Sequence, residues 1–584
     1  MTNRIATNLT AHQLGPEQRQ QAWEQLGKQH FDVIVIGGGI VGTGAALDAA
    51  TRGLSVALIE ARDWASGTSS RSSKMFHGGL RYLEQLEFGL VREALHEREL
   101  VMTKLAPHLV KPQAFIAPLS HHLWERPYMA AGFFLYDTMG GAKTVPRQRH
   151  YTRAGTLRLA PSLKPEGLVG AIRYYDTVMD DARYALTVAR TAAHFGAVVR
   201  TSTQVVGFLQ DGGRVRGVRV RDSESGETTE VLGHAVVNCS GVWTTELHKA
   251  ADIRGRFQVR ASKGVHIVVP RDKIISDVAL ILRTPTSVLY AIPWRERWLI
   301  GTTDTDWKLD LAHPAATRAD IEYILGQVNR ALKVPLTPAD IDGVYAGLRP
   351  LLAGEDEATS KLSREHAVAV DAPGLVSIAG GKYTTYRVMA KDAVDAAVPF
   401  LPTGAPESVT ESVPLLGADG YPALKNKARS IGQDWGVPHD RVVDLLDRYG
   451  SLLPEVLALA EEDPGLLRPV RDASDYLRVE IKYAVVAEGA LHLEDLLARR
   501  TRISIEYAHR GVACAREVAE IAAGVLGWDE RRMKAEIELY TARVDAELRS
   551  QSLTDDASAD ALRAKAPESR GEILEPVPAG GLDS

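Results

Sequence analysis

The chain has 584 residues, of which 45% are hydrophobic, and it carries 69 Lys and Arg against 74 Asp and Glu, a formal net charge of −5. This length is typical of about three or four domains, and the composition is that of a globular protein with a large core rather than of a disordered scaffold. The charge argues against a general nucleic-acid-binding protein and predicts no nucleic-acid partner. Only Cys239 and Cys514 are present, so we expect neither a disulfide framework nor a cysteine metal cluster, which fits a reducing cytosol.

Residues 1–30 are polar and predict a short helical leader. This segment lacks the apolar stretch of a secretory signal peptide, and the sequence has no apolar run of roughly 18 residues or more. We therefore expect a cytoplasmic protein, without export by that route and without a membrane-spanning helix.

Residues 31–61, FDVIVIGGGIVGTGAALDAATRGLSVALIEA, form a strand-turn-helix-strand pattern around three glycines. Gly37 permits a tight turn, Gly39 lets the backbone approach a pyrophosphate, and Gly42 lets the helix lie against the strand. Glu60 ends the second strand, where a carboxylate would hydrogen-bond a ribose hydroxyl. The unit predicts a dinucleotide site at the N-terminus of a helix.

The segments after this unit distinguish between two possible cofactors, a nicotinamide dinucleotide and FAD. A nicotinamide dehydrogenase continues with plain βα units, whereas here a serine-rich loop at 66–82 follows, SGTSSRSSKMFHGGLRY. A buried strand then ends at Gly241, and a late strand at 375–380 ends in the pair Gly380 and Gly381 before a helix. Discontinuous segments of this kind frame one bound cofactor and predict FAD.

The predicted fold class is α/β: an FAD-binding Rossmann-like domain of the amine or amino-acid oxidase type, an antiparallel-β substrate domain and a C-terminal all-α domain. The chain divides into a leader at 1–30, FAD-binding segments at 31–105, 180–250 and 350–400, substrate-binding segments at 106–179 and 251–349, a helical domain at 405–550 and a disordered tail at 551–584.

Several motifs occur in one order along the chain: SSRSSKMFHGGLRYLE, KGVHIVVP, IGTTDTDW, AGLRPL and GGKYTTYR follow the glycine unit. With these motifs the chain closely resembles the FAD-dependent glycerol-3-phosphate dehydrogenase family over residues of about 30 to 530. The first and last motifs are nearly specific to that family, whereas the glycine unit and GTTD are shared with amine- and amino-acid-oxidising flavoproteins. The resemblance implies oxidation of sn-glycerol 3-phosphate at C2 to dihydroxyacetone phosphate, with electrons passing from reduced FAD to a membrane quinone.

Oxidation of a secondary alcohol requires a base for the hydroxyl proton beside the hydride acceptor. His266, beside Lys263 in the KGVHIVVP motif, is the candidate base, because nearby cations keep an imidazole neutral. Arg349 in AGLRPL is the candidate group that stabilises the developing alkoxide. Taken alone, a histidine on a strand is more often structural, and the match to the family pattern favours the catalytic role.

The resemblance also implies substrate and cofactor contacts. A phosphate dianion needs several cations, and the family places them at Arg81, Arg364 and Lys382, with Tyr82 beside the glycerol hydroxyls. The residues expected to contact FAD are Gly37, Gly39, Gly42, Glu60, Ser69, Ser70, Ser73, Lys74, Gly241, Gly380 and Gly381.

No metal site is predicted. His121 and His122 are adjacent rather than at ligand spacing, and no H-E-x-x-H or C-x-x-C motif occurs. Asp304 and Asp306 in GTTDTDW are interpreted as strand-end residues near the substrate domain rather than as an acid-base pair.

A quinone acceptor would require peripheral contact with the inner face of the cell membrane. The aromatic stretch 124–143, WERPYMAAGFFLYDTMGGAK, with flanking Arg126, Lys143 and Arg147, is one candidate surface, although a buried core explains the stretch equally well. The basic segment RRTRISIEYAHRG at 499–511 could serve membrane contact or a homodimer.

Two other functions are weighed against the dehydrogenase. An oxygen-dependent glycerophosphate oxidase carries a long insertion before the S-R segment, whereas only a short connection at 353–363 precedes Arg364 here. A non-catalytic flavin-binding module would not need a base beside the flavin. Both comparisons favour the dehydrogenase.

Overall fold

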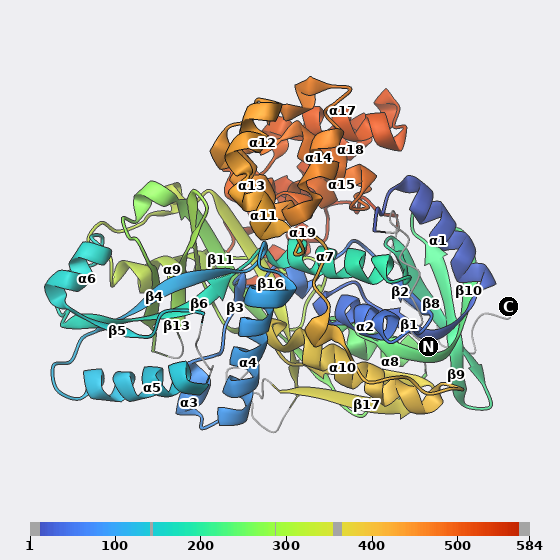
Figure 1. Ribbon diagram of the computed structural model, residues 1–584, viewed down its shortest axis with the longest axis horizontal. Helices are drawn as coiled ribbons and strands as arrows, with labels where there is room; N and C mark the ends of the chain where they lie inside the picture. The colour runs from blue at the N-terminus through green and yellow to red at the C-terminus, as the bar shows by residue number, and fades with distance from the viewer. Residues whose placement is uncertain (1–11, 140–143, 251, 286–287, 354–364, 572–584) are drawn as a thin grey trace.

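The computed structural model describes residues 12–139, 144–250, 252–285, 288–353 and 365–571. Two sheets lie side by side, and a domain of helices lies across them (Figure 1). Sheet A is mainly parallel, as the glycine unit predicts, and sheet B is mainly antiparallel.

Sheet A contains eight of the described strands, with six in the order β17-β18-β10-β1-β2-β7. Parallel pairing joins β18, β10, β1, β2 and β7, and β9 extends the sheet antiparallel to β10. The strand bounds are β1 (His30–Ile36), β2 (Val56–Ile59), β7 (Val198–Arg200), β8 (Thr203–Asp211), β9 (Arg214–Asp222), β10 (Thr228–Asn238), β17 (His366–Ala372) and β18 (Leu375–Gly380).

Helices cover both faces of sheet A, which is why its central strands are apolar throughout. Helices α2 (Ile40–Thr51), α7 (Asp181–His194) and α10 (Tyr386–Ala397) pack together on one face. The predicted leader contains α1 (Pro16–Lys28), which packs on the other face, where Arg19 pairs with Asp222 at 2.7 Å. Residues 16–28 of the leader are therefore part of the first domain.

Sheet B contains ten described strands, and its main path is β15-β11-β14-β13-β12-β4-β6-β3, with β16 on the other side of β11 and β5 beside β6. The pair β4 and β12 is parallel, so the sheet is mixed rather than fully antiparallel. The strand bounds are β3 (Met75–Phe76), β4 (Lys111–Leu119), β5 (Arg149–Thr152), β6 (Gly170–Val178), β11 (Val259–Pro270), β12 (Ala279–Arg283), β13 (Val288–Trp294), β14 (Arg297–Gly301), β15 (Thr305–Trp307) and β16 (Gly343–Leu352).

The serine-rich loop connects the two sheets. It leaves sheet A after β2 and enters sheet B as β3, which pairs with β6, although the sequence places 31–105 in the FAD-binding domain. Helices α3 (Arg81–Glu84), α4 (Phe88–Leu100), α5 (Glu125–Met139), α6 (Arg153–Leu159) and α9 (Arg318–Asn329) follow in and around sheet B.

The C-terminal domain is helical apart from one short hairpin, β19 (Pro469–Val470) and β20 (Ala473–Leu477). A buried ion-pair cluster fixes it to sheet A: Asp63 accepts hydrogen bonds from Arg499 at 2.6 Å and from Arg500 at 2.7 Å. The helices are α11 (Tyr421–Asn426), α12 (Ala428–Trp435), α13 (His439–Tyr449), α14 (Leu453–Ala458), α15 (Arg478–Val486), α16 (Ile503–Glu506), α17 (Ala515–Leu526) and α18 (Glu530–Ser550).

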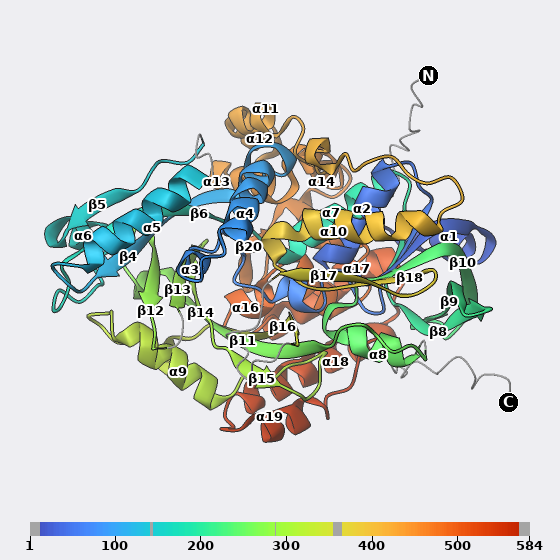
Figure 2. The ribbon, with the colours of Figure 1, turned by 90° about the horizontal axis from the view of Figure 1, so that it is seen from below.

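The prediction of a disordered tail at 551–584 is wrong for residues 551–571. Helix α19 (Asp556–Arg563) lies beside β15 (Figure 2), and the fully buried Ala559 packs in one cluster with Val242, Trp307 and Leu348. Asp556 pairs with the buried Lys263. The polar composition resembles a tail, but burial of a narrow apolar face and ion pairs to distant strands order the segment.

Sheet A and the C-terminal domain also meet at His492, which is fully buried between two carboxylates. Its Nδ1 lies 3.0 Å from Glu536 and its Nε2 lies 3.0 Å from Glu224. Burial and the cation Arg570 oppose protonation, but the two carboxylates outweigh them and raise the pKa of His492 to about 9. Arg532 pairs with Glu536 at 2.9 Å on the outer side.

This arrangement predicts a pH-dependent stability. An unfolded histidine has a pKa of about 6.5. Because the folded value is higher, the stabilisation by His492 is fully present below about pH 6.5 and is lost as pH rises through about 9. A shift of this size corresponds to about 3 kcal/mol in the free energy of unfolding.

We expect His492→Gln to lower the thermal midpoint at pH 6 by several degrees and to flatten its decline between pH 6.5 and 9. The exposed His122→Gln is the matched control and should reproduce the wild-type profile. Thermal scans at one scan rate measure both. An undiminished decline in His492→Gln would assign the pH dependence to other groups.

Candidate active site

A cavity of about 780 Å³ lies between the sheets. It extends from the glycine turn after β1, past the serine-rich loop, to β11 and β16 of sheet B. Its length and its two-sheet wall suit an elongated ligand held by discontinuous segments.

The glycine turn forms the first end of the cavity. Gly37 has φ +111°, and a Cβ there would lie 2.7 Å from the carbonyl oxygen of Cys239. A Cβ at Gly42 would overlap the carbonyl oxygen of Gly37, so Gly42 supports the turn from behind rather than lining the cavity. Gly39 lines the cavity directly before α2, so the N-terminus of this helix lies at the cavity.

Glu60 lies at the end of β2 and lines the same end of the cavity. Its carboxylate accepts hydrogen bonds from the backbone amides of Gly38 at 2.6 Å and Arg62 at 2.7 Å. Burial raises the pKa of Glu60, while the two amides favour the ionised form. The fixed carboxylate is placed to accept a hydroxyl of a ligand that follows the turn.

The serine-rich loop divides into cavity and interior residues. Ser69 and Ser73 line the cavity, and Ser69 Oγ accepts a hydrogen bond from the amide of Ile40 at 2.9 Å. Ser70 and Lys74 are buried and are not among the residues that line the cavity, so their role as FAD contacts stays a prediction. The ammonium of Lys74 donates to Asp181 at 2.7 Å and to the carbonyl of Ser70 at 3.1 Å.

Asp181 explains why the Lys74 side chain points into the protein interior. Burying an ammonium is costly unless a carboxylate meets it, and Asp181, at the start of α7, is fully buried beside Lys74. Arg502 of the C-terminal domain binds the same carboxylate. Lys74 therefore supports the cavity wall from inside.

His266 lies on β11 and is 3% exposed. Its ring stacks on Tyr345 of β16, with centroids 4.9 Å apart and planes at 7°, because the register pairs these two residues. Nε2 lies 2.9 Å from Ser73 Oγ, whereas Nδ1 is buried and meets no hydrogen-bond partner among the described residues. Burial lowers the pKa of His266 to about 3, and the cations Arg349 and Lys74 act in the same direction.

Arg349 of β16 also lines the cavity. Its guanidinium donates to Thr302 Oγ1 and to the carbonyl of Thr303, each at 3.1 Å, and lies 3.6 Å from Asp304. Asp304 lines the cavity as well, a contact that its interpretation as a strand-end residue did not include. Asp306 points elsewhere and pairs with Arg260 at 2.6 Å.

Lys382 and Tyr82 meet at the same cavity. The ammonium of Lys382 lies 3.5 Å from the centroid of the Tyr82 ring, and both residues line the cavity. Arg81 begins α3 next to Tyr82, and Arg364 lies outside the described residues. The site therefore brings Lys382, Tyr82, Arg349 and His266 to one cavity.

The remaining predicted glycines also line the cavity. Gly241, Gly380 and Gly381 all have positive φ, at +61°, +79° and +73°. A Cβ at Gly380 would lie 2.6 Å from the carbonyl oxygen of Glu365, so the turn into α10 requires a glycine. Backbone without side chains thus approaches the ligand space at both ends of the cavity.

Sequence reasoning missed Arg71, Arg62 and Trp243 as cavity residues. Arg71 donates to the carbonyl of Ala312 at 2.8 Å, and burial lowers its pKa to about 10. Arg62 lies 5.5 Å over the Trp243 ring. Arg71 lies inside SSRSSK, so its position in the loop was the available signal, whereas the approach of Trp243 depends on the packing of a distant segment.

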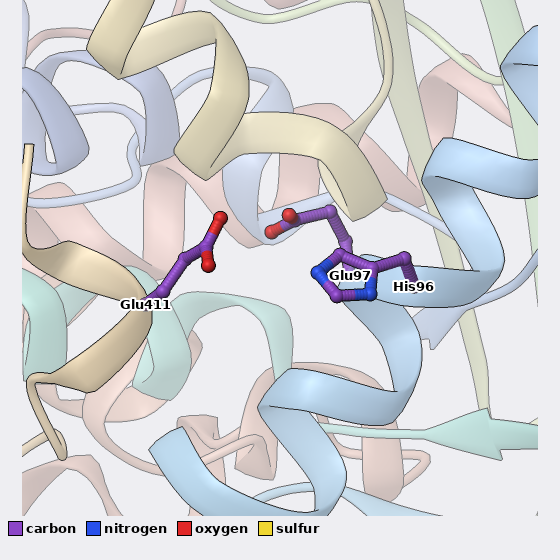
Figure 3. A group of neighbouring side chains, drawn as sticks. All are labelled: His96, Glu97 and Glu411. Atoms are coloured by element: carbon purple, nitrogen blue, oxygen red, sulfur yellow. The ribbon is translucent and has the colours of Figure 1, made fainter.

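A group of acidic and histidine side chains lies outside the cavity. Figure 3 shows His96, Glu97 and Glu411, whose possible ligand atoms lie within 4.8 Å of one another. Arg387 donates to both oxygens of Glu97, at 2.9 and 2.6 Å, and to Glu411 at 3.0 Å. The guanidinium neutralises the charge on which a metal ion would depend.

Comparisons with known proteins agree with this architecture. A family model for FAD-dependent oxidoreductases matches residues 32–387, and one for the C-terminal domain of alpha-glycerophosphate oxidase matches residues 408–533. The structure of a glycerol-3-phosphate dehydrogenase from Bacillus halodurans complexed with FAD superposes with a TM-score of 0.75 at 28% identity, covering 91% of this chain and 98% of that one.

Relatives found by sequence also match over most of the chain. Glycerol-3-phosphate dehydrogenase 2 of Mycobacterium tuberculosis is 69% identical over 97% of each chain. Mitochondrial glycerol-3-phosphate dehydrogenase of Mus musculus is 35% identical, covering 92% of this chain and 77% of that protein. The predicted fold class and the FAD cofactor are confirmed, and the chain belongs to the family of FAD-dependent glycerol-3-phosphate dehydrogenases.

Proposed function

We propose that this dehydrogenase oxidises sn-glycerol 3-phosphate at C2 with His266 as the proton acceptor and passes the electrons to a membrane quinone. The observation that carries the proposal is the buried imidazole of His266 on a cavity wall that also presents the cations Arg349 and Lys382. Bound FAD supplies the acceptor for the hydride that leaves C2.

The glycine turn would hold the cofactor's pyrophosphate, since Gly37 and Gly39 line the cavity before α2 and have no side chains to keep a phosphate from the helix N-terminus. Glu60 would accept a ribose hydroxyl. Ser69, Gly241, Gly380 and Gly381 line the space between this end and His266. The cavity fits a molecule as long as FAD because it reaches from sheet A to sheet B.

His266 would remain a neutral imidazole in the resting enzyme, because its pKa of about 3 lies below the physiological range. A substrate phosphate with nearly two negative charges would raise this pKa on arrival, since an opposite charge favours the imidazolium. Arg349 would stabilise the oxygen at C2 as its proton leaves.

Lys382 would bind the phosphate. Its ammonium lines the cavity above Tyr82, whose ring orients it toward the ligand space. Arg81 and Arg364 would complete the phosphate site, as the family resemblance implies. Several cations around one dianion favour glycerol 3-phosphate over uncharged glycerol.

Exposed apolar side chains beside sheet B support the proposal of membrane contact. They lie on α5, at the start of α4 and on the nearby turns, a set we call the apolar patch: Leu86, Phe88, Leu123, Trp124, Tyr128 and Phe134. Phe133 and Tyr136 of the same helix are buried, so α5 is amphipathic and its aromatic residues belong to both surface and core. No described helix is long and apolar enough to cross a bilayer.

If His266 accepts the proton, His266→Gln should reduce the limiting rate of flavin reduction at least about 100-fold while FAD content is retained. In the wild type the rate of flavin reduction at low substrate concentration should not fall through protonation of His266 between pH 8 and pH 6, because in the free enzyme the imidazole is neutral above a pKa of about 3. Anaerobic stopped-flow spectra measure the first rate at saturating and the second at low substrate concentration.

His234→Gln, outside the cavity, is the matched control and should keep the wild-type rate. An unchanged rate in His266→Gln would move the base to another group.

Loss of the Lys382 charge should raise the KM for glycerol 3-phosphate by about 10- to 100-fold, as expected for one charge-assisted hydrogen bond. Oxidation of glycerol should change little in the same Lys382→Met variant. Steady-state assays compare it with Lys391→Met on the exposed side of α10. Equal losses for both substrates would show that Lys382 supports the fold or the flavin instead.

A soluble quinone analogue should reoxidise the reduced enzyme much faster than oxygen does, and anionic vesicles should bind the protein through the apolar patch. We expect Trp124→Ser combined with Phe134→Ser to reduce co-sedimentation with such vesicles several-fold. The control is Val334→Ser, an exposed apolar residue outside the patch. Equally fast oxidation by oxygen with release of hydrogen peroxide would favour the oxidase.

A further inference from the structure

Ser73 and His266 both line the cavity, and Ser73 occupies the hydrogen-bonding position of the imidazole. His266 is 3% exposed, and its Nδ1 is buried with no partner among the described residues. Its Nε2 is paired with Ser73 Oγ at 2.9 Å. Ser73 itself is half-buried. With Nε2 occupied in this way, a ligand proton would reach the imidazole through the serine hydroxyl.

We propose that Ser73 is a catalytic residue that relays the C2 hydroxyl proton of the substrate to His266. This proposal rests on the proposed role of His266. The substrate O–H bond breaks as its proton moves to Ser73 Oγ, and the serine proton moves to Nε2 of His266. Serine is neutral before and after, the imidazole becomes imidazolium, and the hydride from C2 leaves to the FAD that the established activity supplies.

The serine is held for this transfer by its neighbours in the loop. The amide and the hydroxyl of Ser72 donate to Asp181 at 2.9 and 2.7 Å, and the amide of Lys74 donates to Ser72 Oγ at 3.0 Å. The hydroxyl of Tyr345 donates to the carbonyl of Ser72 at 2.9 Å. Residues on both sides of Ser73 are thus fixed, which limits the ways in which its hydroxyl can move away from His266.

Tyr345 fixes the other partner of the transfer. Its ring stacks on the imidazole while its hydroxyl holds the backbone next to Ser73, so one side chain sets both the acceptor and the relay. Lys74 lies 5.1 Å over the same ring and is held there by Asp181. The distance between Ser73 Oγ and Nε2 is therefore determined by the packing of Lys74, Tyr345 and His266 on one another.

Nδ1 of His266 has no hydrogen-bond partner among the described residues, and this favours return of the proton from the imidazolium through Ser73. A relay to Nε2 requires that Nδ1 carry the hydrogen, and this buried N–H has no acceptor among the described residues. An imidazolium without an acceptor at Nδ1 is poorly stabilised, since a buried donor keeps the full cost of its lost hydration. The proton would return through Ser73 once the ketone product has left.

Ser73→Ala tests the relay. We expect the limiting rate of flavin reduction to fall about 100-fold, with the FAD content unchanged and the KM for glycerol 3-phosphate within threefold of wild type. Ser73→Thr, which keeps a hydroxyl, should retain at least a third of the rate. Ser276→Ala removes a buried hydroxyl of the same domain outside the cavity and controls for general effects.

The dependence of the rate on the deuterium fraction of the solvent gives a second readout, which a structural role would not change. The wild type should give a curved plot that requires two moving protons, and Ser73→Ala a linear one. In a His266→Gln background, Ser73→Ala should cause little further loss, because both residues carry the same proton.

The outcomes separate the two proposals. A full rate in Ser73→Ala with a slow His266→Gln overturns the relay and keeps His266 as the base. Equal losses in Ser73→Ala and Ser73→Thr also overturn it, because the hydroxyl would then be irrelevant. Full rates in both Ser73→Ala and His266→Gln overturn the proposed base itself.

Discussion

The buried ion pair between Lys74 and Asp181 is the interaction on which the site depends. Both side chains are fully buried, and removing one partner of such a pair costs about 3–5 kcal/mol because the other charge is left uncompensated. The pair joins the serine-rich loop to α7, and Arg502 extends it into the C-terminal domain. Three distant segments thus fix one short stretch of cavity wall, and with it the surroundings of His266.

The cavity wall combines two electrostatic demands that would conflict in water. Phosphate binding requires cations, whereas proton abstraction requires a neutral base. Arg349 and Lys382 line the cavity, and in the proposed mechanism they would attract the substrate dianion, while Arg349 also favours the neutral form of His266. Arg349 would therefore serve both demands until substrate arrives, and the substrate itself would then shift the balance toward the imidazolium.

Sequence reasoning succeeded where a function lies within one contiguous unit. Gly37, Gly39 and Glu60 act over a single strand-turn-helix-strand pattern, so their spacing alone places them at the cavity. The direction of the Lys74 side chain could not be predicted, because it is set by Asp181, a residue far along the chain. The tail prediction failed because local composition does not reveal a partner such as Lys263 for Asp556.

Helix α19 makes the order of synthesis relevant to the cofactor site. Ala559 packs against Val242 and Leu348, and both of these line the FAD cavity. These two residues are translated long before α19 leaves the ribosome. A nascent chain that lacks α19 still exposes the back of that wall, so the packing of the cavity wall is completed only once residues 556–563 have been synthesised.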